Sequence, residues 1–179
     1  RLKPGGEPSW RIDEVPLEWC YGDGVVLDLT HKKKGESIEF DDLREALQKI
    51  DYTIKPFDIV LVRTDVYKYI DAKGYENMHP GMSREATLWL IDQGVKVMGI
   101  DAWGWDRPFD VMEEEFRSGA RGRFWAAHFV GREKEYCHLE TLAHLDQIPK
   151  PHGYKVAVFP VKIKKAGAAW VRAVAILDE

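Results

Sequence analysis

Polar residues follow several apolar runs of this sequence, and chemistry could occur at these positions. They are residues 28–31 (DLTH), 63–65 (RTD) and 101–106 (DAWGWD). In α/β proteins, ligands bind at the carboxyl ends of strands, and tryptophan makes a good substrate wall. We therefore consider Asp101, Trp103 and Trp105 as candidates for a substrate pocket. The alternative at each position is a strand-terminal cap or a salt bridge, because turns favour Asp and Thr.

Histidines and cysteines are the other residues that could bind a metal or act as nucleophiles. They are His31, His79, His128, His138, His144, His152, Cys20 and Cys137. No HExxH motif or CxxC spacing occurs among them. His138 alternates with Glu140, but a single spacing of this kind arises by chance, so periodicity alone does not select a metal site. Cys137 lies beside a possible base, His138, and the alternative is a buried structural cysteine.

Length, composition and missing motifs exclude several classes of protein. The 179 residues, 45% of them hydrophobic, are enough to enclose a core, and the formal charge of −4 argues against a nucleic-acid partner. No apolar run approaches the roughly 18–20 residues of a membrane helix. The sequence also lacks a GxSxG elbow, a phosphate-binding loop and a GxGxxG fingerprint. The low cysteine content favours a reduced, cytoplasmic setting.

Strands and helices alternate in the predicted elements, so the fold class is α/β with partly parallel central strands. Strands are predicted at 25–29, 58–64 and 95–101, and helices at 39–50, from Ser83 to Gly94, at 110–117 and at 122–136. Two β-rich runs, 154–163 and 168–177, read as a hairpin or two neighbouring strands. No repeat or linker interrupts the chain, which predicts a single domain over residues 1–179.

The order of several short blocks resembles a known family. The blocks are 25–32 (VVLDLTHK), 58–64 (DIVLVRT), 79–83 (HPGMS), 94–101 (GVKVMGID), 125–128 (WAAH), 139–146 (LETLAHLD), 159–163 (FPVKI) and 170–176 (WVRAVAI). Together they are similar to the metal-dependent cyclase family, which includes bacterial kynurenine formamidase (arylformamidase) and isatin hydrolase. The resemblance implies a swivelling β/β/α fold with mixed sheets and flanking helices. It also implies a homodimer or homotetramer that hydrolyses an amide-like bond.

The resemblance also implies a metal site. Members of the family hold one or two divalent ions, usually zinc or manganese, with a histidine and a glutamate twelve residues later as ligands. His128 and Glu140 match this pair in type and spacing, and Glu140 would be the carboxylate able to bridge two ions. Such an ion lowers the pKa of water and polarises a carbonyl. The implied substrate is a formylated arylamine or a cyclic amide.

One family segment has no counterpart in the sequence. This segment is of the HxGTHxDxPxH type and supplies further ligands and the proton-transferring histidine, so we expect the catalytic residues upstream of Arg1. With two ligands rather than three, the chain is expected to bind metal poorly and to be inactive. Two hypotheses follow: a hydrolase without its N-terminal metal-binding segment, or a truncated, non-catalytic relative that acts as a binding or assembly module. In a third interpretation, His128 and Glu140 form only a surface ion pair.

Overall fold

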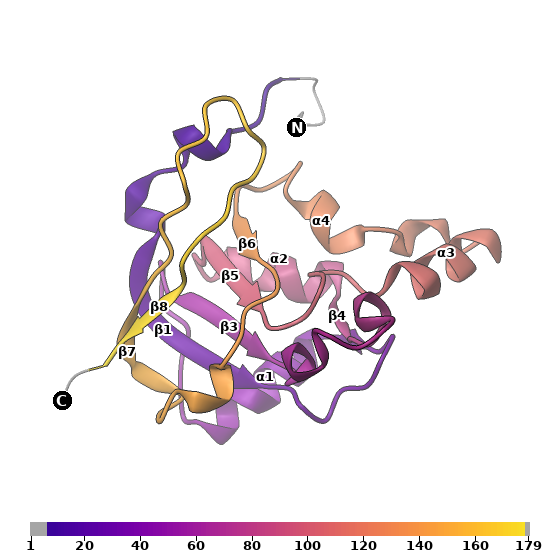
Figure 1. Cartoon of the computed structure of the whole chain (residues 1–179), viewed down its shortest axis with the longest axis horizontal. Coiled ribbons are helices and arrows are strands. Elements are labelled where there is room, and N and C mark those ends of the chain that lie inside the picture. The colour runs from indigo at the N-terminus through magenta and orange to yellow at the C-terminus, as the bar shows by residue number, and fades with distance from the viewer. Residues whose placement is uncertain (1–6, 178–179) are drawn as a thin grey trace.

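A six-stranded sheet forms the centre of the computed structural model, which describes residues 7–177 (Figure 1). Its strands are β1 (Tyr21–Asp28), β3 (Ile59–Arg63), β5 (Val97–Ile100), β6 (Cys137–Leu139), β7 (His152–Ala157) and β8 (Val174–Ile176). They lie in the order β6-β5-β3-β1-β7-β8. The first four are parallel, whereas β7 and β8 are antiparallel to their neighbours. The sheet is therefore mixed, as the sequence predicts.

Helices and short turns surround this sheet. The helices are α1 (Phe40–Lys49), α2 (Arg84–Asp92), α3 (Phe109–Arg117) and α4 (Ala126–Val130). A second, two-stranded parallel sheet joins β2 (Ser37–Ile38) to β4 (Gly81–Met82). Short 3-10 turns cover Ile12–Glu14, Leu17–Trp19, Val66–Tyr69, Tyr75–Asn77, Arg121–Arg123 and Leu145–Gln147. In Figure 1, α1 and α2 lie behind the sheet and α3 projects to the right.

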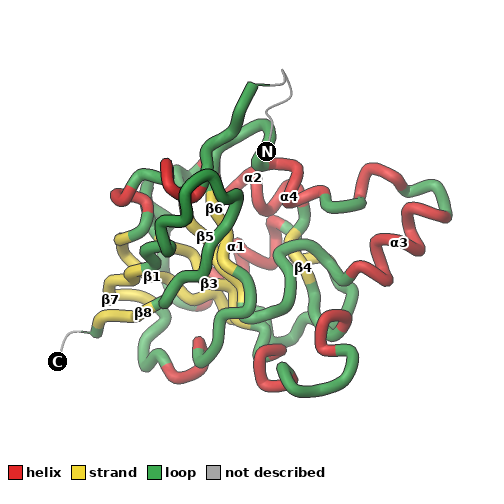
Figure 2. The backbone as a smooth tube through the Cα atoms, turned by 45° about the horizontal axis from the view of Figure 1, so that its top comes forward, coloured by secondary structure: helices red, strands yellow, loops and turns green. Residues whose placement is uncertain are grey.

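Each face of the sheet carries its own core, because successive strand residues point to opposite faces. Val25 and Leu27 of β1 face the helices and pack with Leu43 of α1 and Leu90 of α2. Val26 faces the other way, into a smaller cluster with residues of β3, β5 and β7. The N-terminal turns and the segment between β7 and β8 lie side by side on that second face, where Ile12 N–H donates to Ala166 O at 3.0 Å (Figure 2).

Most predicted elements agree with the structure. Strands 58–64 and 95–101 contain β3 and β5, and helices 39–50 and 110–117 correspond to α1 and α3. Ser83 is the N-cap of α2, because its side chain accepts a hydrogen bond from Ala86 N–H at 3.0 Å. The run 154–163 overlaps β7 and the run 168–177 contains β8, and the two strands pair as antiparallel neighbours.

The predicted helix at 122–136 is wrong. The structure has only the five residues of α4 there, preceded by a 3-10 turn and followed by β6. Trp125 has a left-handed φ of 50°, which interrupts helical geometry before α4. After α4 a turn at residues 131–133 leads to β6, a strand of three residues that the sequence does not predict.

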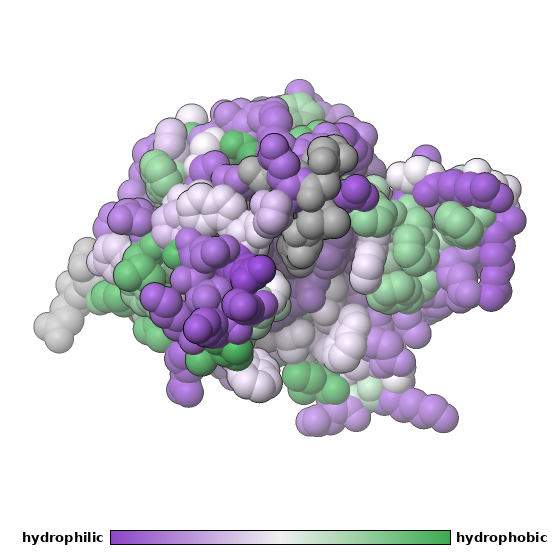
Figure 3. Space-filling model, turned by 90° about the horizontal axis from the view of Figure 1, so that it is seen from above, coloured by the Kyte–Doolittle hydropathy of each residue, from purple (hydrophilic) through white to green (hydrophobic). Residues whose placement is uncertain are grey.

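Gly81 of β4 allows two segments to approach closely. A Cβ atom there would lie 2.1 Å from Arg107 N and 2.2 Å from Asp106 C, so only glycine fits. Apolar side chains gather on the side where α3 projects (Figure 3), and the exposed ones include Phe109 and Phe116. Within residues 7–177, no helix has the length and apolar character needed to cross a membrane.

Candidate metal centre

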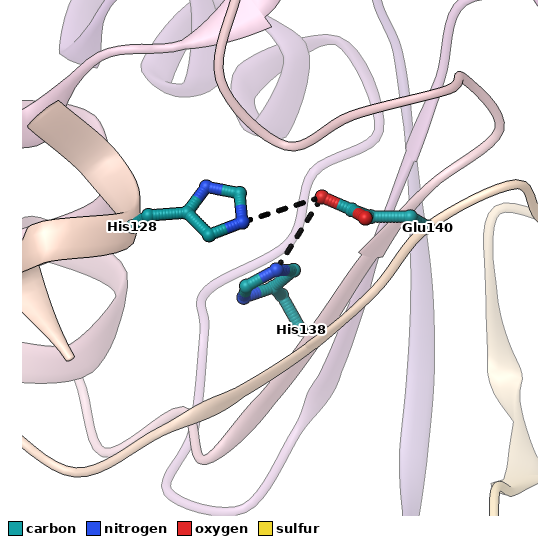
Figure 4. A group of neighbouring side chains, drawn as sticks. All are labelled: His128, His138 and Glu140. Atoms are coloured by element: carbon teal, nitrogen blue, oxygen red, sulfur yellow. Dashed lines mark ion pairs between the residues drawn. The ribbon is translucent and has the colours of Figure 1, made fainter. Parts of the chain in front are cut away.

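Three side chains that can bind a metal come together at the end of β6. His128 lies in α4, His138 in β6, and Glu140 follows β6 (Figure 4). Their ligand atoms lie within 4.8 Å of one another. Glu140 Oε1 is 3.6 Å from His128 Nε2 and 3.4 Å from His138 Nε2. The cluster thus has two imidazoles facing one carboxylate oxygen.

Local backbone structure positions the carboxylate. His138 and Glu140 are two residues apart along extended chain, which brings their side chains to the same side of the sheet. Trp105 N–H donates to Glu140 Oε1 at 2.9 Å, and Thr141 N–H donates to Ala102 O at 2.7 Å. Thr141 has a φ of 57°, a strained value for a β-branched residue. The loop after β5 therefore holds Glu140 in place through backbone hydrogen bonds.

Electrostatics keep Glu140 charged. Burial alone would raise the pKa of Glu140, but the hydrogen bond and charge of His138, the Trp105 N–H and the charge of His128 together lower it below its usual value. The His128 and His138 side chains are 20% and 9% exposed. The donors therefore lie at a partly enclosed position that a small ligand can still reach.

Two cavities border this cluster. The smaller has a volume of about 350 Å³ and is lined by His128, Glu140 and Thr141, by three aromatic rings and by His79. The aromatic residues are Trp103, Phe109 and Trp125. The larger, of about 1000 Å³, is also lined by His138 and extends over the second face of the sheet. A molecule in either cavity could therefore contact the cluster.

His79 is a buried part of the smaller cavity's wall. Its Nδ1 lies 2.8 Å from Pro80 O and its Nε2 lies 3.1 Å from Glu76 O. Burial lowers the pKa of His79, although both carbonyls favour the protonated ring. These two contacts fix the orientation of the ring.

The three predicted pocket residues have different surroundings. Trp103 is 51% exposed and lines the smaller cavity. Trp105 instead lies in the core, 0% exposed, with its indole N–H donating to Thr87 Oγ1 at 3.1 Å. Asp101 is also buried and accepts hydrogen bonds from Thr64 N–H and Thr64 Oγ1, both at 2.6 Å. Packing and turn formation thus account for Trp105 and Asp101, which line neither cavity.

His138 is the cluster member that sequence reasoning missed. The alternation of His138 with Glu140 could have identified it, because alternate residues of a strand point to the same face. The sequence does not predict the short strand β6, so this alternation could not be interpreted. His128 and Glu140 lie together, as the resemblance implies. Their role as metal ligands stays a prediction.

Comparisons with known proteins identify the family. The model of the family described as "Putative cyclase" matches residues 3–107, more than half of the chain. An isatin hydrolase bound to the product analogue thioisatinate has a similar structure, with a TM-score of 0.79 and 20% identity over 94% of this chain and 64% of that chain. Isatin hydrolase A from Labrenzia aggregata, bound to benzyl benzoate, gives a TM-score of 0.76 and 24% identity over 98% of this chain and 67% of that one.

A potential metal-dependent hydrolase with cyclase activity also has a similar structure, with a TM-score of 0.69 and 22% identity over 99% of this chain and 74% of that chain. The present chain spans less than two thirds of the length of the thioisatinate-bound hydrolase. No curated protein matches the sequence. The structural similarities show a shared fold, and the family match covers more than half of the chain, so this chain belongs to the putative cyclase family.

Proposed function

We propose that the chain is a metal-dependent hydrolase that cleaves an amide-like bond, of the arylformamidase or cyclic amidase type. The observation that carries this proposal is the convergence of His128, His138 and Glu140 beside two cavities. The names of the structural neighbours, isatin hydrolase and metal-dependent hydrolase, support the reaction class. The substrate we propose is a formylated arylamine or a cyclic amide.

The donor set fits a divalent cation. Two imidazoles and one carboxylate are the ligand combination of several catalytic zinc sites, which leave a fourth position open. Carboxylate and imidazole ligands also suit manganese. When bound, such an ion polarises a carbonyl and lowers the pKa of water. His138 supplies the third donor, so the chain is better equipped to bind a metal than His128 and Glu140 alone would make it.

The chain's own residues supply the rest of the site. Trp103, Phe109 and Trp125 give the smaller cavity an aromatic wall, which suits a planar ring. Glu140 stays negative because His138 and the Trp105 N–H stabilise its charged form. The cavity thus provides a ring-binding surface next to the charged cluster.

A binding experiment tests this proposal. Zinc or manganese is titrated into the metal-free chain by calorimetry, followed by assays of N-formylkynurenine and isatin hydrolysis. We expect each chain to bind at least one ion. The affinity for the metal should be lower in Glu140→Gln and His138→Ala but unchanged in His31→Ala. The last variant is a control, since the His31 side chain is 56% exposed and outside the cluster.

Two outcomes would contradict the proposal in different ways. If neither metal binds, His128 and Glu140 form only an ion pair. If metal binds but a protein that also carries an HxGTHxDxPxH-type segment hydrolyses neither substrate, the alternative of a non-catalytic binding or assembly module is favoured.

We also propose a cytoplasmic location and assembly into a homodimer or homotetramer. The low cysteine content of the sequence, with Cys20 and Cys137 as its two cysteines, supports the reduced setting. The assembly rests on the family resemblance, and light scattering tests it; a monomeric mass would contradict it.

A further inference from the structure

We propose that Asp106 is a positioning residue that holds His128 in the tautomer and orientation needed for metal binding. This inference rests on the proposed function, because it assigns a role toward the same cluster. Asp106 lies in the loop between β5 and α3 and is 4% exposed. Its carboxylate lies on the side of His128 away from Glu140, because it contacts Nδ1 whereas Glu140 faces Nε2.

Three hydrogen bonds fix this carboxylate. Ala127 N–H donates to Oδ1 at 2.8 Å, and His128 N–H donates to Oδ2 at 2.9 Å. The ring nitrogen His128 Nδ1 also lies 2.5 Å from Oδ2. Asp106 therefore contacts both the backbone and the ring of His128.

The chemistry of these groups selects one tautomer. A carboxylate can only accept hydrogen bonds, so His128 Nδ1 carries the hydrogen. In a neutral imidazole the other nitrogen, Nε2, then keeps its lone pair. This is the atom that faces Glu140 Oε1 at 3.6 Å. A carboxylate behind a histidine is a common way to orient a metal ligand.

The same contacts hold α4 in place. The first N–H groups of a helix lack partners within the helix, and a side-chain oxygen usually accepts from them. The residue before α4, Trp125, has a φ of 50° and its side chain makes no capping hydrogen bond. Asp106 accepts from the second and third residues of α4 instead. Helix position and ring orientation thus depend on one side chain.

The variant Asp106→Asn separates these two roles. Asparagine keeps one oxygen, in place of Oδ1, to accept from Ala127 N–H. Its NH₂ group takes the place of Oδ2, so it loses the hydrogen bond from His128 N–H and presents a donor to His128 Nδ1, which favours the opposite tautomer. We expect the variant to fold with α4 intact. Its His128 ring should carry the hydrogen on Nε2, and its zinc affinity should fall by about 10–100-fold.

The control is Asp58→Asn. Asp58 is another buried carboxylate, 2% exposed, that accepts from Tyr52 Oη at 2.9 Å and Lys55 N–H at 2.8 Å. This variant should lose stability but keep the His128 tautomer and the zinc affinity. The tautomer is read from ¹⁵N NMR of the imidazole in metal-free protein, at pH about 8, above the reference histidine value of about 6.5. Zinc affinity is measured by calorimetry.

Each outcome decides the role of Asp106. Unchanged tautomer and zinc affinity in Asp106→Asn overturn it while leaving the proposed function intact. If the unsubstituted chain binds no zinc, the metal site itself is overturned, and this role with it. Should Asp106→Asn fail to fold, the unsubstituted chain still tests the inference: a hydrogen on His128 Nε2 would contradict it.

Discussion

Glu140→Gln should abolish most of the stabilisation that zinc gives the folded chain. Glutamine has the same shape as glutamate and can still accept from the Trp105 N–H, which lies 2.9 Å from Glu140 Oε1. The metal-free variant should therefore fold normally. It lacks the negative charge that faces His128 and His138 at 3.6 and 3.4 Å, so its affinity for a cation must fall.

The size of the effect follows from binding linkage. Loss of a direct ligand should weaken binding on the order of 100-fold, at least as much as loss of an outer hydrogen-bond partner. At a zinc concentration of about 100 times its Kd, the unsubstituted chain gains about 2.7 kcal/mol, whereas a 100-fold weaker variant gains about 0.4 kcal/mol. For a chain of this size, about 2–4 °C of Tm corresponds to 1 kcal/mol. Zinc should therefore raise the Tm by about 5–11 °C for the unsubstituted chain and by about 1–2 °C for Glu140→Gln.

Thermal melting with and without zinc measures both shifts, monitored by circular dichroism. His31→Ala is the control and should behave like the unsubstituted chain, since its exposed ring lies outside the cluster. Equal zinc-induced shifts in Glu140→Gln and the unsubstituted chain would refute the reasoning. They would show that zinc binds elsewhere.

Three further predictions concern stability. Trp105→Ala should cost about 3–5 kcal/mol in urea denaturation, because the fully buried ring and its hydrogen bond to Thr87 are lost; a cost below about 1 kcal/mol would contradict this. Asp65→Asn should cost about 1 kcal/mol at pH 7, since the Arg63 guanidinium lowers the pKa of Asp65 to about 2 and the exposed part of the pair is screened. The pKa of Asp65 in the folded chain lies below its unfolded value of about 3.9, so this stabilisation is fully present above about pH 3.9 and is lost as pH falls through about 2. Below that pH the two proteins should unfold at equal urea concentration. Thr141→Gly should raise the free energy of unfolding by about 1 kcal/mol, because it relieves a left-handed φ of 57°; a loss of stability would refute the strain.

The parts of the fold that could be predicted are those whose pattern is local. The apolar run at 58–64 could be recognised because β3 is buried on both faces and is continuously apolar. The spacing of α1 could be recognised because burial on one face of a helix imposes a helical period on the sequence. The region around α4 has no such pattern. Its start depends on the left-handed Trp125 and on a carboxylate twenty residues away, so nothing near His128 in the sequence marks the helix boundary.

The candidate site shows the same division. The spacing of His128 and Glu140 could be recognised through the family resemblance. His138 could not be recognised in this way, because β6 has only three residues and is separated from its neighbour β5 by the segment that contains α3 and α4. Trp105 was predicted from its residue type beside two aspartates, yet its ring is in the core and its backbone N–H is what contacts the cluster.

The family-matched segment and the cluster are physically connected. The match covers residues 3–107 and so contains none of the three candidate ligands. It does contain Asp106, which accepts from His128, and Trp105, whose N–H donates to Glu140. Gly81, in the same segment, lets the backbone at Asp106 and Arg107 pack against β4 without a Cβ clash. The matched segment therefore supplies the hydrogen bonds that position His128 and Glu140, two of the three donors. The segment matched by the family model and the candidate metal site thus belong to one structural unit.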